Sequence, residues 1–162
     1  MPSPARKVVL GLGNILNRDE GLGVRALELL NTQPGLPSGF ELLDGGVLGL
    51  NLLMVVEECS HLLILDSVDA GMPPGALVEL RKEEIPLFSG VKLSQHQVTF
   101  QEVLGLAAIR GHLPENLYLI GIQPLDISIG LDMSAEVRNN LPFVAARAAT
   151  VMQQWENSQQ RR

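Results

Sequence analysis

The chain is poor in cysteine and in aromatic residues, and it carries no excess of positive charge. Cys59 is its single cysteine, which excludes an internal disulfide framework and any zinc site built from several thiolates. Aromatic residues make up 4% of the chain and hydrophobic residues 46%, so we expect an aliphatic core. The net charge of −6 argues against binding to nucleic acid and to anionic membrane surfaces.

Long apolar runs are also missing. None approaches the roughly 20 residues that a membrane-spanning helix needs, and residues 1–7 lack the apolar region of a signal peptide. We therefore expect a cytoplasmic protein without a membrane segment. Because no long apolar surface helix demands a partner, we expect a monomer. The length predicts a single domain over residues 1–162, with residues 157–162 frayed.

Strand and helix patterns alternate along the chain. The sequence predicts strands at 7–12, 40–43, 61–65, 76–81 and 117–122 and helices at 21–31, 49–58, 99–110 and 134–155. The strand at 76–81 is expected at an edge of the sheet, and Pro142 predicts a kink or a break in the last helix. This order is typical of one three-layer α/β domain, with a twisted and mostly parallel sheet flanked by helices.

The first predicted strand is joined to the first predicted helix by a glycine-rich stretch, residues 11–23, which reads Gly-Leu-Gly-Asn-Ile-Leu-Asn-Arg-Asp-Glu-Gly-Leu-Gly. A dinucleotide fingerprint requires glycine where Leu16 stands, and a P-loop requires Gly-Lys-Ser/Thr where Asp19 and Glu20 stand. Two carboxylates repel a phosphate, and they suit a cation or proton transfer instead. Asp19 is also expected to cap the helix that follows.

Three polar residues are expected at one edge of the sheet. Glu20 lies in the loop after the first strand, Asp66 ends the apolar run of the third strand, and His96 lies just before the helix at 99–110. Ligands of open α/β sheets bind outside the carboxyl ends of the strands, so the three side chains could converge there. Such oxygen and imidazole ligands suit a divalent ion such as Ni, Zn, Mn or Fe, and they also suit general acid–base catalysis.

Each of these residues also has a structural interpretation. Glu20 could stabilise a helix N-terminus, Asp66 could cap its own turn, and a lone histidine such as His96 is more often a loop or capping residue than a ligand. A Cys59 nucleophile beside His61 is disfavoured, because two acidic neighbours would raise the pKa of the thiol. The sequence contains no Gly-x-Ser-x-Gly elbow and no His-Glu-x-x-His helix.

An ordered combination of five segments resembles the nickel–iron hydrogenase maturation proteases, most of all those that serve uptake hydrogenases. The segments are residues 11–23, 43–46, 62–66, 94–97 and 119–124. The resemblance implies a twisted sheet flanked by helices. It further implies that the Asp-Gly-Gly segment, formed by Asp44, Gly45 and Gly46, bears on the choice of substrate.

The resemblance also implies an activity and a metal. The activity is that of an aspartyl-type endopeptidase that removes the C-terminal tail of a hydrogenase large-subunit precursor. The precursor already carries nickel, which serves as the recognition signal and is contacted by Glu20, Asp66 and His96. We expect Asp66 or Glu20 to act as the base and His96 to orient the metal. The main alternative is a docking or nickel-sensing module that binds the same precursor without cutting it, and a weaker one is a small-molecule hydrolase or phosphorylase.

Overall fold

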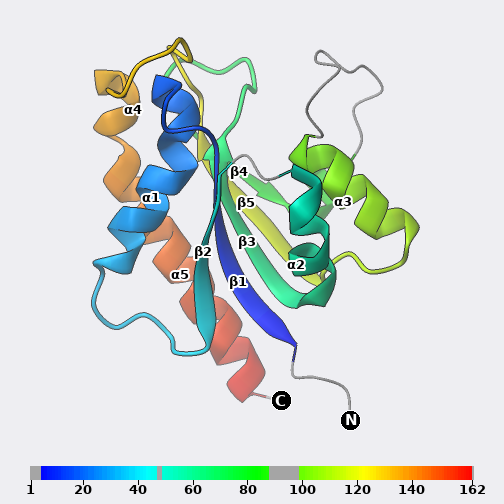
Figure 1. The fold of residues 1–162 in the computed structure, drawn as a ribbon. Coiled ribbons are helices and arrows are strands. Elements are labelled where there is room, and N and C mark those ends of the chain that lie inside the picture. The colour runs from blue at the N-terminus through cyan, green and yellow to red at the C-terminus, as the bar shows by residue number, and fades with distance from the viewer. Residues whose placement is uncertain (1–4, 47–48, 88–98, 162) are drawn as a thin grey trace.

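The computed structural model describes residues 5–46, 49–87 and 99–161. A single five-stranded sheet runs through the molecule in the order β2-β1-β3-β5-β4 (Figure 1). Four strands are parallel: β1 (Arg6–Leu12), β2 (Phe40–Gly46), β3 (Cys59–Ser67) and β5 (Asn116–Ile122). The strand β4 (Leu77–Arg81) lies at an edge and is antiparallel to β5. The predicted α/β class, with a mostly parallel sheet, is therefore confirmed.

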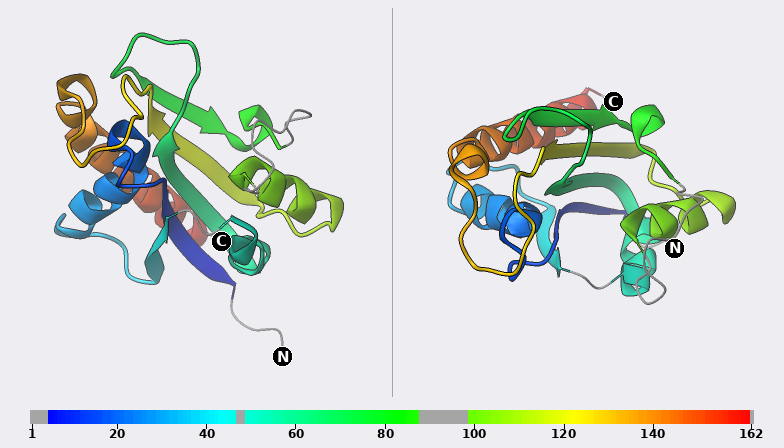
Figure 2. Two further views of the ribbon diagram at one scale, coloured as in Figure 1. Left: turned by 45° about the horizontal axis from the view of Figure 1, so that its top comes forward. Right: turned by 90° about the horizontal axis from the view of Figure 1, so that it is seen from above.

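Helices cover both faces of this sheet (Figure 2). On one face lie α1 (Leu22–Asn31) and α5 (Leu141–Gln160), and on the other lie α2 (Leu53–Glu58) and α3 (Phe100–Ile109). Successive side chains of a strand point to opposite faces, so Val9 packs in the core under α1 and α5, whereas Leu10 packs in the core under α2 and α3. Strands buried on both faces read as continuous apolar runs, which is why they could be found in the sequence.

The last predicted helix is divided in two, as Pro142 predicted. The short helix α4 (Ala135–Arg138) is followed by α5, and Pro142 lies in the first turn of α5, where a backbone N–H is not needed. The helix α5 continues to Gln160. Fraying of the chain after residue 156 therefore stays a prediction. None of the helices in the described ranges is long and apolar enough to cross a membrane.

Two strands continue further than predicted. The Asp-Gly-Gly segment, predicted as a tight turn, forms the end of β2 because the end of β1 pairs with it across a bulge. Asp66, predicted to follow the third strand, lies within β3 because it pairs with Gly121 of β5. Both extensions add backbone order at the carboxyl edge of the sheet, where the candidate site lies.

Candidate active site

The turn that carries Glu20 lies against the end of β3 through close backbone contacts. Glu20 belongs to the 3₁₀ turn Arg18–Gly21, directly before α1. A Cβ atom at Gly13, whose φ is +114°, would overlap the carbonyl oxygen of Glu20, and a Cβ atom at Gly23 would overlap the carbonyl oxygen of Leu65. Only glycine permits these approaches. The glycines of the stretch 11–23 therefore position the turn rather than cradle a phosphate.

Asp66 is half-buried near the end of β3, beside this turn. Its carboxylate accepts a hydrogen bond from the backbone N–H of Ser67 at 2.8 Å. Burial raises the pKa of Asp66 to about 7, and the negative charge of Glu20 adds to the rise, although the hydrogen bond from Ser67 opposes it. Glu20 and Asp66, two of the three predicted site residues, are thus brought together at the carboxyl edge of the sheet.

Two neighbouring carboxylates, of which Asp66 has a raised pKa, suit a cation or a proton transfer. Across residues 5–46, 49–87 and 99–161, no basic side chain forms an ion pair with Glu20 or Asp66. In the same ranges no group of three His, Cys, Asp or Glu side chains could hold a metal ion. His96, the third predicted ligand, lies outside the described residues, so the predicted set of three stays a prediction.

The Asp-Gly-Gly segment borders the same turn. The backbone N–H of Gly13 donates a hydrogen bond to the carbonyl oxygen of Gly46 at 3.0 Å. Asp44 is exposed, whereas Gly45 is buried, and a Cβ atom at Gly45 would contact the Leu10 and Leu12 side chains. An exposed carboxylate is thus held close to the turn of Glu20, and its effect on substrate choice stays a prediction.

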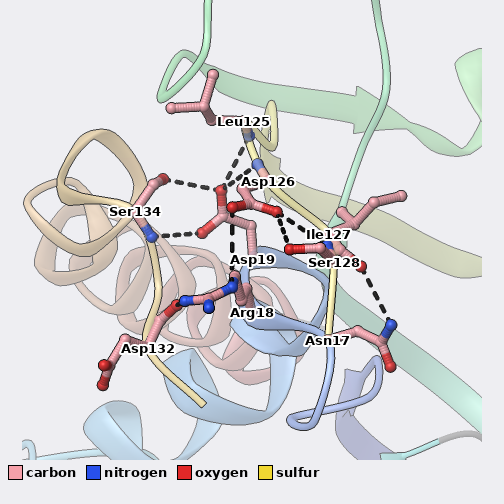
Figure 3. Close-up of polar contacts among 9 residues, drawn as sticks. All are labelled: Asn17, Arg18, Asp19, Leu125, Asp126, Ile127, Ser128, Asp132 and Ser134. Atoms are coloured by element: carbon pink, nitrogen blue, oxygen red, sulfur yellow. Dashed lines mark hydrogen bonds and ion pairs between the residues drawn. The ribbon is translucent and has the colours of Figure 1, made fainter. Parts of the chain in front are cut away.

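Asp19 differs completely from its neighbour Glu20, because its side chain is fully buried. Its carboxylate accepts four hydrogen bonds: two from the backbone N–H groups of Leu125 and Asp126, at 2.9 Å each, and two from the N–H and hydroxyl of Ser134, at 2.8 Å each (Figure 3). Burial alone would raise the pKa of Asp19, but these donors outweigh it and hold the pKa below its ordinary value. The prediction that Asp19 caps α1 was wrong, because its partners lie 106 to 115 residues further along the chain.

Arg18 joins the same two parts of the chain. Its backbone adopts a positive φ of +48°, and its N–H donates to the carbonyl oxygen of Gly130 at 3.1 Å. Its guanidinium donates to the carbonyl oxygen of Asp132 at 3.3 Å and lies 3.8 Å from the carboxylate of Asp126 (Figure 3). A Cβ atom at Gly130 would contact this guanidinium. The loop after β1 and the segment after β5 therefore form one unit beside the site.

The segment after β5 was missed by prediction from sequence, because no helix or strand was predicted between residues 124 and 134. The available signal was an aliphatic residue at every second position: Leu125, Ile127, Ile129 and Leu131. Such an alternation is typical of a strand. Here the residues between them, Asp126, Ser128 and Gly130, make polar contacts instead of a regular ladder.

The structure does not support catalysis by Cys59. This residue is buried at the start of β3, the end opposite to Asp66, and burial raises the pKa of its thiol to about 12. The thiol is therefore protonated at neutral pH and is a poor nucleophile. His61 is buried as well, with its ring edge-on to Trp155 at 5.2 Å between centroids and its Nδ1 2.8 Å from the Ser60 hydroxyl.

Known proteins are similar to this chain in sequence and in fold. A family model described as hydrogenase maturation protease matches residues 24–151. The chain is 43% identical over 157 residues to the hydrogenase expression/formation protein HupD of Rhizobium leguminosarum bv. viciae, covering 95% of this chain and 78% of that protein. It is 40% identical over 134 residues to the hydrogenase 2 maturation protease of Escherichia coli K12, covering 81% of this chain and 82% of that protein.

A solved structure of a hydrogenase maturating endopeptidase has a similar fold. The hydrogenase maturating endopeptidase HybD from E. coli superimposes with a TM-score of 0.82 at 33% sequence identity, covering 92% of this chain and 93% of that one. The chain therefore belongs to the hydrogenase maturation protease family.

Proposed function

We propose that this protein is an endopeptidase that removes the C-terminal tail of the large-subunit precursor of a nickel–iron hydrogenase. Membership of the family and the similarity to the hydrogenase 2 maturation protease of E. coli support a peptidase of hydrogenase maturation. The observation that carries the site is the pairing of Glu20 with Asp66, whose pKa is raised to about 7. On this proposal the protein works in the cytoplasm as a monomer.

One carboxylate of the pair acts as the general base. Asp66 is the better choice, because in the protein without nickel its pKa is raised to about 7, which makes it more basic than an ordinary aspartate. The water attacks the scissile carbonyl carbon, and the protonated Asp66 then gives its proton to the leaving amine. The neighbouring charge of Glu20 favours the protonated form of Asp66 and so assists the first step.

Nickel enters as part of the substrate. We propose that Glu20, Asp66 and His96 are the residues that meet the nickel of the precursor, since carboxylate and imidazole are suitable ligands for it. The two carboxylates at one edge of the sheet form an anionic pair that would attract a divalent cation. Recognition of nickel would restrict cleavage to precursors that have received their metal, and the exposed Asp44 would help to select among precursors.

A processing assay tests this proposal. The purified protein is mixed with a nickel-loaded precursor and, in parallel, with the same precursor lacking nickel, and loss of the tail is followed by intact mass. We expect cleavage of the loaded form alone, and we expect Glu20→Gln and Asp66→Asn to abolish it. The matched control is Glu28→Gln, which neutralises an exposed carboxylate on α1.

Other results would favour other functions. Cleavage of both precursors would remove the nickel requirement but keep the endopeptidase. Binding of the loaded precursor without cleavage would favour the docking or nickel-sensing module. Full processing by the double variant of Glu20 and Asp66 would show that the active site lies elsewhere.

A further inference from the structure

Six exposed aliphatic residues lie in two hydrogen-bonded loops beside the proposed active site, and we call them the apolar rim. Two of them lie in the loop after β1 and four in the segment after β5: Ile15, Leu16, Leu125, Ile127, Ile129 and Leu131. The four after β5 are between 54% and 84% exposed. Single exposed aliphatic residues are ordinary, but a contiguous group marks a binding surface.

Hydrogen bonds between the two loops make the rim one surface. The N–H of Gly130 donates a hydrogen bond to the carbonyl oxygen of Leu16 at 2.8 Å. Gly130 lies between Ile129 and Leu131, the two most exposed aliphatic residues of the segment. The side-chain amide of Asn17 donates to the carbonyl oxygen of Ile127 at 3.1 Å (Figure 3). These contacts use backbone and polar atoms, so the aliphatic side chains are left for a partner.

The buried carboxylate of Asp19 holds the rim in place through hydrogen bonds. A buried carboxylate is costly unless it is fully hydrogen-bonded, and Asp19 satisfies this condition through donors that all belong to residues 125–134. The aliphatic residues are therefore prevented from folding back into the protein. A rigid apolar surface loses little conformational entropy when a partner binds.

The chemistry of the rim selects its partner. Arg18 contacts the segment, but its guanidinium is already engaged by Asp126 and by the carbonyl oxygen of Asp132. The rim therefore offers little to an acidic peptide. A lipid surface is disfavoured by the net charge of −6. What remains is an uncharged polypeptide segment with aliphatic or aromatic side chains.

The position of the rim suggests which polypeptide that is. Leu16 precedes Glu20 by four residues. Asp19 accepts a hydrogen bond from the N–H of Leu125, a rim residue, and the residue after Asp19 is Glu20 of the proposed site. We propose that the apolar rim binds an apolar segment of the protein substrate close to the bond that is cut, an inference that rests on the proposed function. The rim then supplies affinity, while Glu20 and Asp66 supply the chemistry.

Two matched double variants test this inference. Ile127→Ser with Ile129→Ser removes two rim side chains. The control, Met54→Ser with Ile109→Ser, removes two similarly exposed side chains on α2 and α3, which cover one face of the sheet away from the rim. Binding of the nickel-loaded precursor and its processing are measured for both. For the rim variant we expect Kd and KM to rise at least tenfold, with kcat within twofold of wild type and an unchanged thermal midpoint. The control should match wild type.

The outcomes separate the inference from the function on which it rests. If wild type cleaves the precursor and the rim variant has the same KM, the rim is not the docking surface although the endopeptidase stands. If wild type binds without cleaving, the endopeptidase fails and the rim is judged on Kd alone. If wild type neither binds nor cleaves, both are wrong. A wild-type dimer that only the rim variant dissociates, seen by sedimentation velocity, would make a second copy the occupant and overturn the inference.

Discussion

Both oxygens of the Asp19 carboxylate accept a hydrogen bond from Ser134, one from its backbone N–H and one from its hydroxyl, each at 2.8 Å. Ser134 also caps α4, because its hydroxyl oxygen accepts a hydrogen bond from the N–H of Val137 at 3.4 Å. One residue thus fixes the start of a helix and the turn beside the active site. The energetic importance of this contact can be measured directly.

Replacement of Asp19 by Asn should destabilise the protein by about 2–4 kcal/mol, because an amide NH₂ would face N–H donors and leave buried groups unpaired. The measurement is urea unfolding at neutral pH. Ser134→Ala should cost about 1 kcal/mol, since it removes one hydroxyl donor. The exposed carboxylate of Asp132 on the same segment offers a control, and Asp132→Asn should leave the midpoint unchanged. Equal effects of the two Asp→Asn variants would contradict a stabilising role of the Asp19 hydrogen bonds.

Asp66→Asn should stabilise the protein in a pH-dependent manner. Because the pKa of Asp66 is raised from 3.8 to about 7, the folded protein keeps a proton that the unfolded chain releases over that interval. Wild-type stability therefore falls as the pH rises from 3.8 to about 7, whereas the amide does not ionise. The stability difference should be small in acid and reach about 4 kcal/mol above neutrality. A difference that is constant with pH would argue against a raised pKa.

Gly13→Ala should be far more harmful than Gly35→Ala. Both glycines have a positive φ, +114° and +75°, but a Cβ atom at Gly13 would overlap the carbonyl oxygen of Glu20, whereas at Gly35 it would meet open space. We expect Gly35→Ala to cost about 1 kcal/mol, the penalty of a left-handed conformation, and Gly13→Ala about 3 kcal/mol or more. Unfolding and precursor processing should both report the difference. Similar costs at the two sites would mean that the turn gives way easily.

The ion pair of Glu79 with Arg147 should stabilise the contact between β4 and α5. Arg147 donates to both carboxylate oxygens at 2.8–3.2 Å, and Tyr118 donates to Oε1 at 2.8 Å. Arg147 outweighs burial and lowers the pKa of Glu79, so this stabilisation is present above the ordinary pKa of a glutamate and is lost as the pH falls through the lowered value. Glu79→Gln should cost about 1 kcal/mol at neutral pH and less in acid.

The matched control for this prediction lies at the end of β4. Glu84 pairs with Arg81 at 3.0 Å, but both side chains are exposed, so Glu84→Gln should produce no measurable change in thermal midpoint. Thermal unfolding across a pH series would compare the two variants. An equal effect of both would mean that partial burial adds nothing to the Glu79 pair.

The sheet could be predicted from sequence because its strands are buried on both faces. Strands of this kind, such as Leu62–Leu65 within β3, are continuous aliphatic runs with a polar residue at the end. The ends of parallel strands lie at one edge, so the sequence could place Glu20 and Asp66 together at the carboxyl edge of the sheet. The break at Pro142 followed from the chemistry of proline alone.

Other features depend on partners that are remote in sequence. Asp19 and Glu20 are adjacent acidic residues on one loop, and local pattern does not distinguish the buried carboxylate from the one at the site. Their difference comes from N–H donors 106 to 115 residues away. The extension of β2 through Asp44 likewise depends on pairing with β1. The aliphatic residue at every second position from Leu125 to Leu131 was visible in the sequence. The exposure of these side chains, however, depends on the contacts of the segment with Arg18 and Asp19.

The hydrogen bonds of Asp19 also determine when the proposed active site can be completed during synthesis. A ribosome makes the chain from its N-terminus, so the turn of Glu20 emerges long before Leu125 and Ser134 have been added. Until then the carboxylate of Asp19 has none of its four donors. In a nascent chain the turn of Glu20 therefore lacks its contacts with residues 125–134, and this edge of the sheet is completed only after those residues have been added.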